Sequence, residues 1–168
     1  MIFMSQSGLT ARERAADWDR WYVDHLRIML TVPGVHTTQR FKSGTPGYPP
    51  SLAMYSIESA AVFQGPYYLS VRGMGEWLPF IDRQWYRRNL FDGAAIAPAV
   101  ASHQALLVCD SDAPRAAPQG IDVLWLASVG LDRSTAHRGI AVIDGRGDNA
   151  PPPGYALYRP VTEYRASP

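Results

Sequence analysis

The segment from Trp18 to Val35, WDRWYVDHLRIMLTVPGV, places a histidine and a tyrosine among tryptophans. Helical spacing puts Tyr22 and His25 on one face, because residues three apart are neighbours on a helix. An imidazole, with an ordinary pKa of about 6.5, exchanges protons at neutral pH. Burial among aromatic rings lowers that pKa and favours the neutral base. His25 is therefore either a proton-transfer residue or a histidine packed in an aromatic core.

Further polar side chains are candidates for the same site. Tyr22 either donates a hydrogen bond to an oxyanion or the imidazole, or only packs. Arg40 shares one face of a predicted strand with His36,. If that face lines a cavity, Arg40 can bind a substrate carboxylate or enolate; if it meets solvent, Arg40 is an edge charge. Tyr55, on the next predicted strand, is expected in the same cavity.

Aromatic and basic side chains are dense between residues 67 and 86. They either form a core beneath an irregular segment or make the wall of a pocket for a flat, apolar ligand. Together with Trp18 and Trp21, four of them are candidate substrate-binding residues: Tyr67, Arg72, Trp77 and Trp85. Tyr68 and Tyr86 belong to the same cluster.

Neither a metal nor a cofactor is predicted. The histidines at 25, 36, 103 and 137 form no pair at helical i, i+4 spacing,. The single cysteine, Cys109, excludes a cysteine-based zinc cluster and reads as a buried thiol,. No glycine-rich nucleotide loop and no nucleophile elbow occurs. Haem, with His25 as its axial ligand, is an alternative.

Composition narrows the class of protein further. The chain has 168 residues, a net charge of +1 and one lysine, Lys42. Without a basic stripe, nucleic acid is not an expected partner. No apolar stretch approaches the roughly 20 residues of a membrane span, and the first residues, MIFMSQSG, lack the features of a signal peptide. These observations predict a cytoplasmic protein with no membrane partner.

Hydrophobic patterning predicts the elements of the first part of the chain. Thr10 and Glu13 form a capping-box pattern before a helix over 11–30, and Pro33-Gly34 ends it. Alternating residues in 35–42 predict a strand, paired antiparallel with 51–58. The other expected elements are a strand at 2–5, a short helix capped by Ser59, an irregular segment over 65–80, a helix over 81–91 and a strand over 99–110.

The rest of the chain reads as a linker over 111–120, a strand over 121–131, a short helix capped near Asp132 and a last strand over 155–165,. The order β-α-β-β-α-β, then β-α-β, predicts an α+β fold with a ferredoxin-like antiparallel sheet and helices on one face. The expected domains are a ferredoxin-like unit over 1–110 and a C-terminal β-α-β extension over 121–168 packed on it. The other sheet face needs a second copy or a lid of C-terminal elements.

The first half resembles the EthD-like group of the dimeric α/β-barrel superfamily. The residues that carry the resemblance are Trp21, His25, Leu26, Pro33, Gly34, Arg40, Ala53 and Tyr55. The C-terminal third has no counterpart in that pattern. The resemblance implies a ferredoxin-like fold, a homodimer formed through the sheets and a ligand cavity between sheet and helices.

Together, the acid/base residues and the resemblance predict a cofactor-independent enzyme. It would be a lyase or isomerase (a dehydratase, cyclase or decarboxylase) acting on a small aromatic or polyketide-like molecule. His25 would move a proton next to a carbonyl, while Arg40 and Tyr22 or Tyr55 stabilise the developing charge. The alternatives are a non-catalytic small-molecule binding protein, a haem-binding protein or cofactor-free monooxygenase, and a structural subunit.

Overall fold

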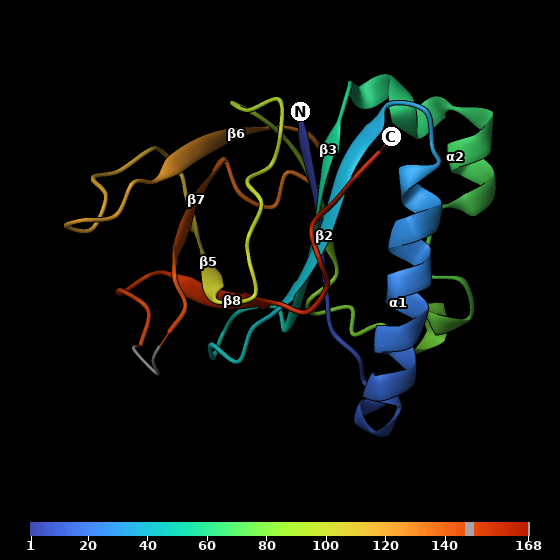
Figure 1. The fold of residues 1–168 in the computed structure, drawn as a ribbon, viewed down its shortest axis with the longest axis horizontal. Coiled ribbons are helices and arrows are strands. Elements are labelled where there is room, and N and C mark those ends of the chain that lie inside the picture. The colour runs from blue at the N-terminus through green and yellow to red at the C-terminus, as the bar shows by residue number, and fades with distance from the viewer. Residues whose placement is uncertain (147–149, 168) are drawn as a thin grey trace.

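The computed structural model describes residues 1–146 and 150–167. In these ranges, eight antiparallel strands close into one barrel, in the order β3-β1-β4-β6-β7-β5-β8-β2, with β2 pairing back onto β3 (Figure 1). A short ninth strand, β9, adds to β2. The strands are β1 Ile2–Ser7, β2 Val35–Lys42, β3 Ser51–Ile57, β4 Arg87–Asp92, β5 Gln104–Ser111, β6 Leu124–Leu131, β7 His137–Asp144, β8 Ala156–Pro160 and β9 Arg165–Ala166.

The helices lie outside the barrel, on the side of β2 and β3 (Figure 1). They are the α-helices α1 Ala15–Leu30 and α2 Pro66–Val71, and the 3-10 helices η1 Arg12–Arg14, η2 Ala60–Gln64 and η3 Gly75–Phe80. Among the described residues, no helix has the length and apolarity that crossing a membrane requires.

The expected open ferredoxin-like sheet with helices on one face is wrong. The strands that flank β1 and β3 do not end the sheet, because β4 pairs onward with β6, and β2 pairs with β8 and β9. Strands from the C-terminal part of the chain therefore complete a ring. The ferredoxin-like, dimeric α/β-barrel description is corrected to a closed antiparallel barrel within one chain.

The two expected domains also meet within this barrel. β5, which falls in the range 1–110, pairs along its length with β7 and also with β8, both from 121–168. The C-terminal part is therefore built into the sheet. Its predicted helix near Asp132 is wrong, because Leu131 and Arg133 have φ of 61° and 46° in a turn that leads into β7.

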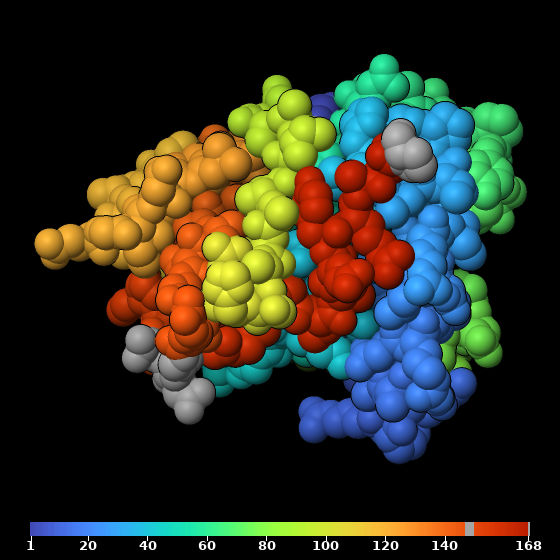
Figure 2. All heavy atoms as spheres, viewed as in Figure 1, coloured from blue at the N-terminus to red at the C-terminus, as the bar shows by residue number. Residues whose placement is uncertain are grey.

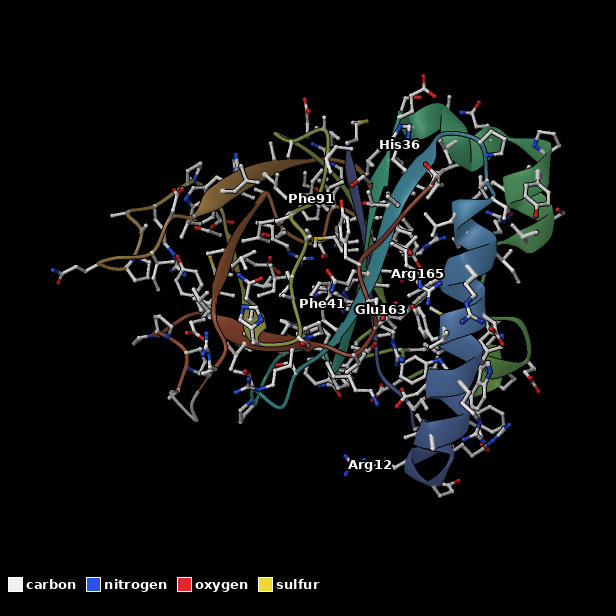
Figure 3. All side chains as sticks on the ribbon, in the orientation of Figure 1. Arg12, His36, Phe41, Phe91, Glu163 and Arg165 are labelled. Atoms are coloured by element: carbon white, nitrogen blue, oxygen red, sulfur yellow. The ribbon has the colours of Figure 1, made fainter. Side chains whose placement is uncertain are left out.

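The barrel interior is a packed apolar core. Phe41 and Phe91 project into it from β2 and β4 (Figure 3). The sheet face that a second copy would cover in the dimeric arrangement lines this interior, so a homodimer would have to use another surface. Other members of this core are Ile2, Met4, Leu52, Met54, Leu106, Val108, Leu126, Ile140 and Tyr158.

A second core lies between the helices and the outer face of the barrel. α1 buries one stripe at i, i+4, i+8 and i+11, formed by Trp18, Tyr22, Leu26 and Met29,. The predicted capping box is wrong: the helix begins at Ala15 with no side-chain cap, and the Thr10 hydroxyl donates to the carbonyl of Phe80 at 3.1 Å.

The turn after α1 depends on Gly34. Its φ is +84°, in the left-handed region,. A Cβ there would lie 2.7 Å from Cγ2 of Val62, at η2. The turn therefore sets both the angle at which β2 leaves α1 and the approach of η2. Ser59 caps η2 as predicted, with its hydroxyl accepting from the Ala61 N–H at 3.3 Å.

The predicted helix over 81–91 is also wrong. Residues 83–85 form a turn, and β4 begins at Arg87. Neighbouring side chains on β4 alternate, so Leu90 packs in the helix-side core and Phe91 in the barrel interior,. This alternation directs Tyr86 and Arg88 toward the helices.

The segment after β4 crosses the front of the molecule beside the C-terminal segment (Figure 2). The Tyr164 hydroxyl donates to the carbonyl of Ala97 at 3.3 Å. The amide of Gln39, on β2, donates to the carbonyls of Val100 and Thr162 at 2.7 and 3.2 Å. These contacts hold the two segments against the barrel wall.

Candidate active site between the helices and the barrel

A cavity of about 40 Å³ lies between α1, the segment from α2 to η3, and strands β1, β3 and β4. It contains His25, as a catalytic role requires. It also contains Tyr22 and Tyr55, which the sequence placed with His25. The full lining is Phe3, Ser5, Tyr22, His25, Met29, Tyr55, Tyr68, Arg72, Gly73, Met74, Tyr86 and Arg88.

Two neighbours on α1 hold the imidazole of His25. It stacks on Trp21 with ring centroids 4.7 Å apart and planes inclined by 10°. Tyr22 meets it edge to face at 5.8 Å. Burial lowers the pKa of His25 to about 4,. At neutral pH the ring is therefore an uncharged imidazole, able to accept a proton, with its orientation fixed by packing.

Tyr22 and Tyr55 supply hydroxyl groups to the same cavity. Both side chains are buried, and the Tyr55 ring stacks on Phe3 at 5.1 Å. Burial raises the pKa of Tyr22, an effect that the Arg40 charge partly offsets, and it raises the pKa of Tyr55 well above 10. Both phenols stay protonated at neutral pH, so each can donate a hydrogen bond to a developing negative charge.

Arg40 lies behind this cavity and does not line it. It is 1% exposed, with its guanidinium carbon 4.2 Å from the Tyr22 ring and 4.6 Å from the Trp18 ring. Nη1 donates to Asp19 at 2.8 Å, and Nε to the Ser51 hydroxyl at 3.1 Å. Direct substrate binding by Arg40 is therefore not supported, and neither is a solvent-exposed edge position.

Other arginines and tyrosines occupy the place expected for Arg40. Arg72, from the predicted aromatic cluster, lines the cavity together with Tyr68, Tyr86 and Arg88. Arg88 was missed because its segment was read as a helix. The usable signal was the period of two in Tyr86, Arg88 and Leu90, which marks one face of a strand.

The remaining predicted substrate-binding residues lie outside the cavity. Trp18 packs against the guanidinium of Arg40, and Trp21 is connected to the cavity only through the ring of His25. Tyr67 is 44% exposed and bonds Thr31 through its hydroxyl at 2.8 Å. Two more are remote: Trp77 is buried against Phe80 and Arg14, and Trp85 packs by Gly8.

His36 is separated from the site by an irregularity in β2. The register with β3 shifts between Val35 and Thr37. Val35 consequently packs in the helix-side core, whereas Thr37 bonds Ser56 within the barrel. The carbonyl of His36 accepts from Ser167 at 2.8 Å, which places it beside the C-terminal segment (Figure 3).

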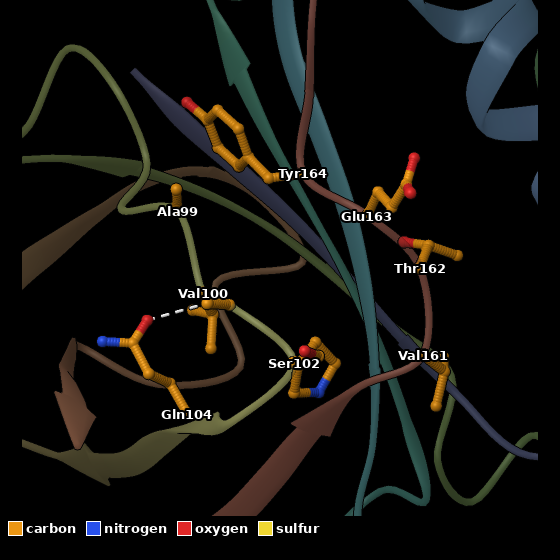
Figure 4. A pocket seen from close by; sticks show the side chains of 10 residues that line it. Ala99, Val100, Ser102, Gln104, Val161, Thr162, Glu163 and Tyr164 are labelled. Carbon is orange, nitrogen blue, oxygen red and sulfur yellow. Dashed lines mark hydrogen bonds between the residues drawn. The ribbon is translucent and has the colours of Figure 1, made fainter. Parts of the chain in front are cut away.

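A larger hollow of about 650 Å³ opens between the segment after β4 and the residues that follow β8 (Figure 4). Gln104 there accepts a hydrogen bond from the Ala101 N–H at 2.9 Å. Its lining in the described chain is mostly small or apolar, and Glu163 is its charged member. Without a group that titrates near neutral pH, this hollow is a weaker candidate for proton-transfer chemistry than the His25 cavity.

No family model, curated protein or solved structure matches this chain. The resemblance to the EthD-like group therefore stays a prediction. What the cavity can do follows from its own groups: a neutral imidazole, protonated phenols and guanidinium charges surround a small volume. That set can accept a proton and stabilise an oxyanion.

Proposed function

We propose that the protein is a cofactor-independent acid/base enzyme acting on a small aromatic or polyketide-like molecule, with lyase or isomerase chemistry. His25 takes a proton from the carbon next to a carbonyl. Tyr22 and Tyr55 donate hydrogen bonds to the enolate oxygen as negative charge develops there. The proton then leaves the imidazole for the product or for water, which returns the site to its starting state.

The observation that carries this proposal is the convergence of His25, Tyr22 and Tyr55 on one cavity. α1 carries His25 and Tyr22, and β3 carries Tyr55. Phe3, on β1, stacks on the Tyr55 ring and so supports it. A low pKa leaves the imidazole unprotonated but weakly basic. Hydrogen bonds to the enolate oxygen therefore have to carry much of the stabilisation.

The cavity as it stands, at about 40 Å³, is smaller than the roughly 300–1,000 Å³ of usual small-molecule sites,. An aromatic substrate enters only if part of the wall moves. The segment 66–80 forms the outer wall and carries exposed Leu69 and Leu78. Tyr68, Met74 and Trp77 are its buried anchors. We infer that this segment shifts outward when substrate binds.

Deuterium exchange tests the chemistry without knowledge of the natural substrate. A panel of small aromatic ketones and β-diketones is incubated with the protein in D₂O, and loss of the proton next to the carbonyl is followed by NMR. We expect the wild type to accelerate exchange of at least one compound. His25→Gln should abolish the acceleration while keeping the fold. Equal exchange by both proteins across the panel would reject the proposal.

A non-catalytic binding protein is the second candidate, and the pKa of about 4 favours it, because so weak a base accepts a proton poorly,. This alternative predicts that His25→Phe binds a panel member as tightly as wild type and that neither protein exchanges it. A haem-binding role is less well supported, since the cavity, at about 40 Å³, is far below the roughly 300–1,000 Å³ of usual ligand and cofactor sites,.

A further inference from the structure

The two fully buried arginines of the described residues, Arg40 and Arg138, each bond a carboxylate, although Nη2 of Arg40 has no partner there. Arg40 bonds Asp19 at 2.8 Å. Arg138, inside the barrel, is fully buried and bonds Asp110 twice, at 2.7 and 2.9 Å. This pairing is the usual requirement, because a guanidinium removed from water needs an acceptor for its N–H groups.

Arg72, which is exposed, and Arg88, which is half-buried, are placed differently. Both line the His25 cavity, yet neither forms an ion pair within the described residues. Nε of Arg88 is buried and has no hydrogen-bond partner in that part of the chain. The carboxylate of Asp132 accepts from the backbone N–H of Arg88 at 2.7 Å, so it neutralises no guanidinium N–H there.

The two guanidinium charges act on the same part of the cavity. Burial raises the pKa values of Tyr68 and Tyr86, and Arg88 and Arg72 each partly offset that rise in both residues. Arg88 also lies 5.9 Å from the ring of Tyr86. The lining contains no aspartate or glutamate within the described chain. Two guanidinium charges therefore act at one end of a cavity whose lining supplies no anion, although the Asp132 carboxylate, outside the lining, raises the pKa of Tyr86 against them.

We propose that Arg72 and Arg88 bind the anionic group of the ligand, and that this ligand is a small aromatic molecule carrying a carboxylate. A planar carboxylate matches the fork of a guanidinium and would satisfy Nε of Arg88. The phenols of Tyr68 and Tyr86 can donate to the same oxygens. This assignment rests on the proposed function, because it specifies which molecules reach His25.

Binding of simple probes tests the assignment directly. Isothermal titration calorimetry compares benzoate with benzamide, which has a similar shape but no charge, and with inorganic phosphate. We expect benzoate to bind at least tenfold more tightly than benzamide, as a charge-assisted hydrogen bond implies. Equal affinity for benzoate and benzamide, or no binding of benzoate at millimolar concentration, overturns the proposal. Binding of phosphate without benzoate also overturns it, in favour of a phosphoryl site.

Neighbouring arginines provide a matched control. Arg88→Gln and Arg72→Gln should each weaken benzoate binding by roughly tenfold or more. Arg87→Gln should leave it unchanged, because Arg87 is exposed and its Nη1 bonds backbone carbonyls of Arg83 and Tyr86. If all three variants bind benzoate like wild type, the anion lies elsewhere and the assignment is wrong.

The test separates this inference from the proposed enzyme function. His25→Gln should bind benzoate within about threefold of wild type, because the imidazole is not the anion ligand. Exchange that depends on His25 but acts equally on charged and neutral ketones rejects only the carboxylate assignment. Benzoate binding that depends on Arg88, without any exchange, rejects only the enzyme.

Discussion

Trp21 and His25 stack one helical turn apart on α1, with ring centroids 4.7 Å apart and planes only 10° from parallel. The indole covers one face of the imidazole, and the Tyr22 edge closes a second side. The ring nitrogens consequently keep a fixed direction, and water reaches only part of the ring. The low pKa of His25 follows from this enclosure.

Stability should depend on pH through His25. The folded pKa of about 4 lies below the ordinary histidine pKa of 6.5. The unfolded state therefore binds more protons between these values. The contribution is fully present above pH 6.5, and up to about 3 kcal/mol of unfolding free energy is lost as pH falls to 4. Urea denaturation at pH 7 and 4.5 should show a smaller loss for His25→Gln than for wild type. Equal losses in both proteins contradict the buried, neutral imidazole.

Removing the stacking partner should raise the pKa of His25. Trp21→Leu exposes one face of the imidazole to water and so stabilises its charged form. NMR titration of the imidazole protons, assigned by their absence in His25→Gln, should show the pKa moving from about 4 toward 6.5. Trp85→Leu is the control, because Trp85 packs by Gly8, away from the cavity. An unchanged pKa of His25 in Trp21→Leu would mean that other groups shield the imidazole from water.

Breaking the ion pair beneath α1 should destabilise the fold. Asp19→Asn removes the carboxylate that bonds Arg40, whose side chain is 1% exposed. An unpaired buried guanidinium is costly, and we expect a loss of roughly 2–4 kcal/mol in unfolding free energy. Asp17→Asn should change it by less than about 0.5 kcal/mol, because its pair with Arg20 is exposed,. Similar urea midpoints for the two variants would contradict this account.

Two glycines with similar backbone angles should respond differently to alanine. Gly34 and Gly47 have φ of +84° and +80°. At Gly47 an added Cβ meets nothing within 4 Å, so the cost is conformational, about 1–2 kcal/mol,. At Gly34 the Cβ would also press on Val62, and thermal unfolding should show a larger loss. Val62→Ala in the Gly34→Ala background should recover part of the lost stability. If nothing is recovered, the loss in Gly34→Ala comes from the backbone conformation alone.

Closure of the barrel by the C-terminal strands makes a prediction about fragments. Residues 1–110 alone would expose the inward faces of β1 to β4, including Phe41 and Met54, to water. They would also leave β5 without β7 and β8. We expect this fragment to show no cooperative thermal transition by circular dichroism, whereas the full chain does. A monomeric, cooperatively folding fragment would support an independent domain instead.

Local patterns identified the parts of the fold that depend on neighbouring residues. The spacing of Trp18, Tyr22 and Leu26 predicted α1, and the alternation in 35–42 and 51–58 predicted the hairpin of β2 and β3. Tyr22, His25 and Tyr55 were placed together from the order of these elements. Each inference needed only periodicity and a turn at Pro33-Gly34.

The remaining features of the fold and the site depend on contacts between residues far apart in the sequence, which local patterns do not reveal. Met4, Leu52 and Met54 show that the inner sheet face is apolar, but an apolar face does not reveal whether a second copy or the same chain covers it. Asp132 looked like a helix cap, yet its carboxylate accepts from the backbone of Arg88, 44 residues earlier. Arg40 was expected in the cavity because it lies on the face of its strand that is turned toward α1. Its partner Asp19, on α1, was not considered.

The pairing of β2 with β8, which closes the barrel, joins residues made early with residues made more than 110 positions later. Phe41 pairs with Pro160, and Lys42 with Arg159. During synthesis on the ribosome, β2 therefore gains these partners only after β8 has been made. The hairpin of β2 and β3 and its cover of α1 can form long before that point. The part of the cavity wall that α1 and β3 provide can thus form first, and the ring closes only after residue 160 has been made.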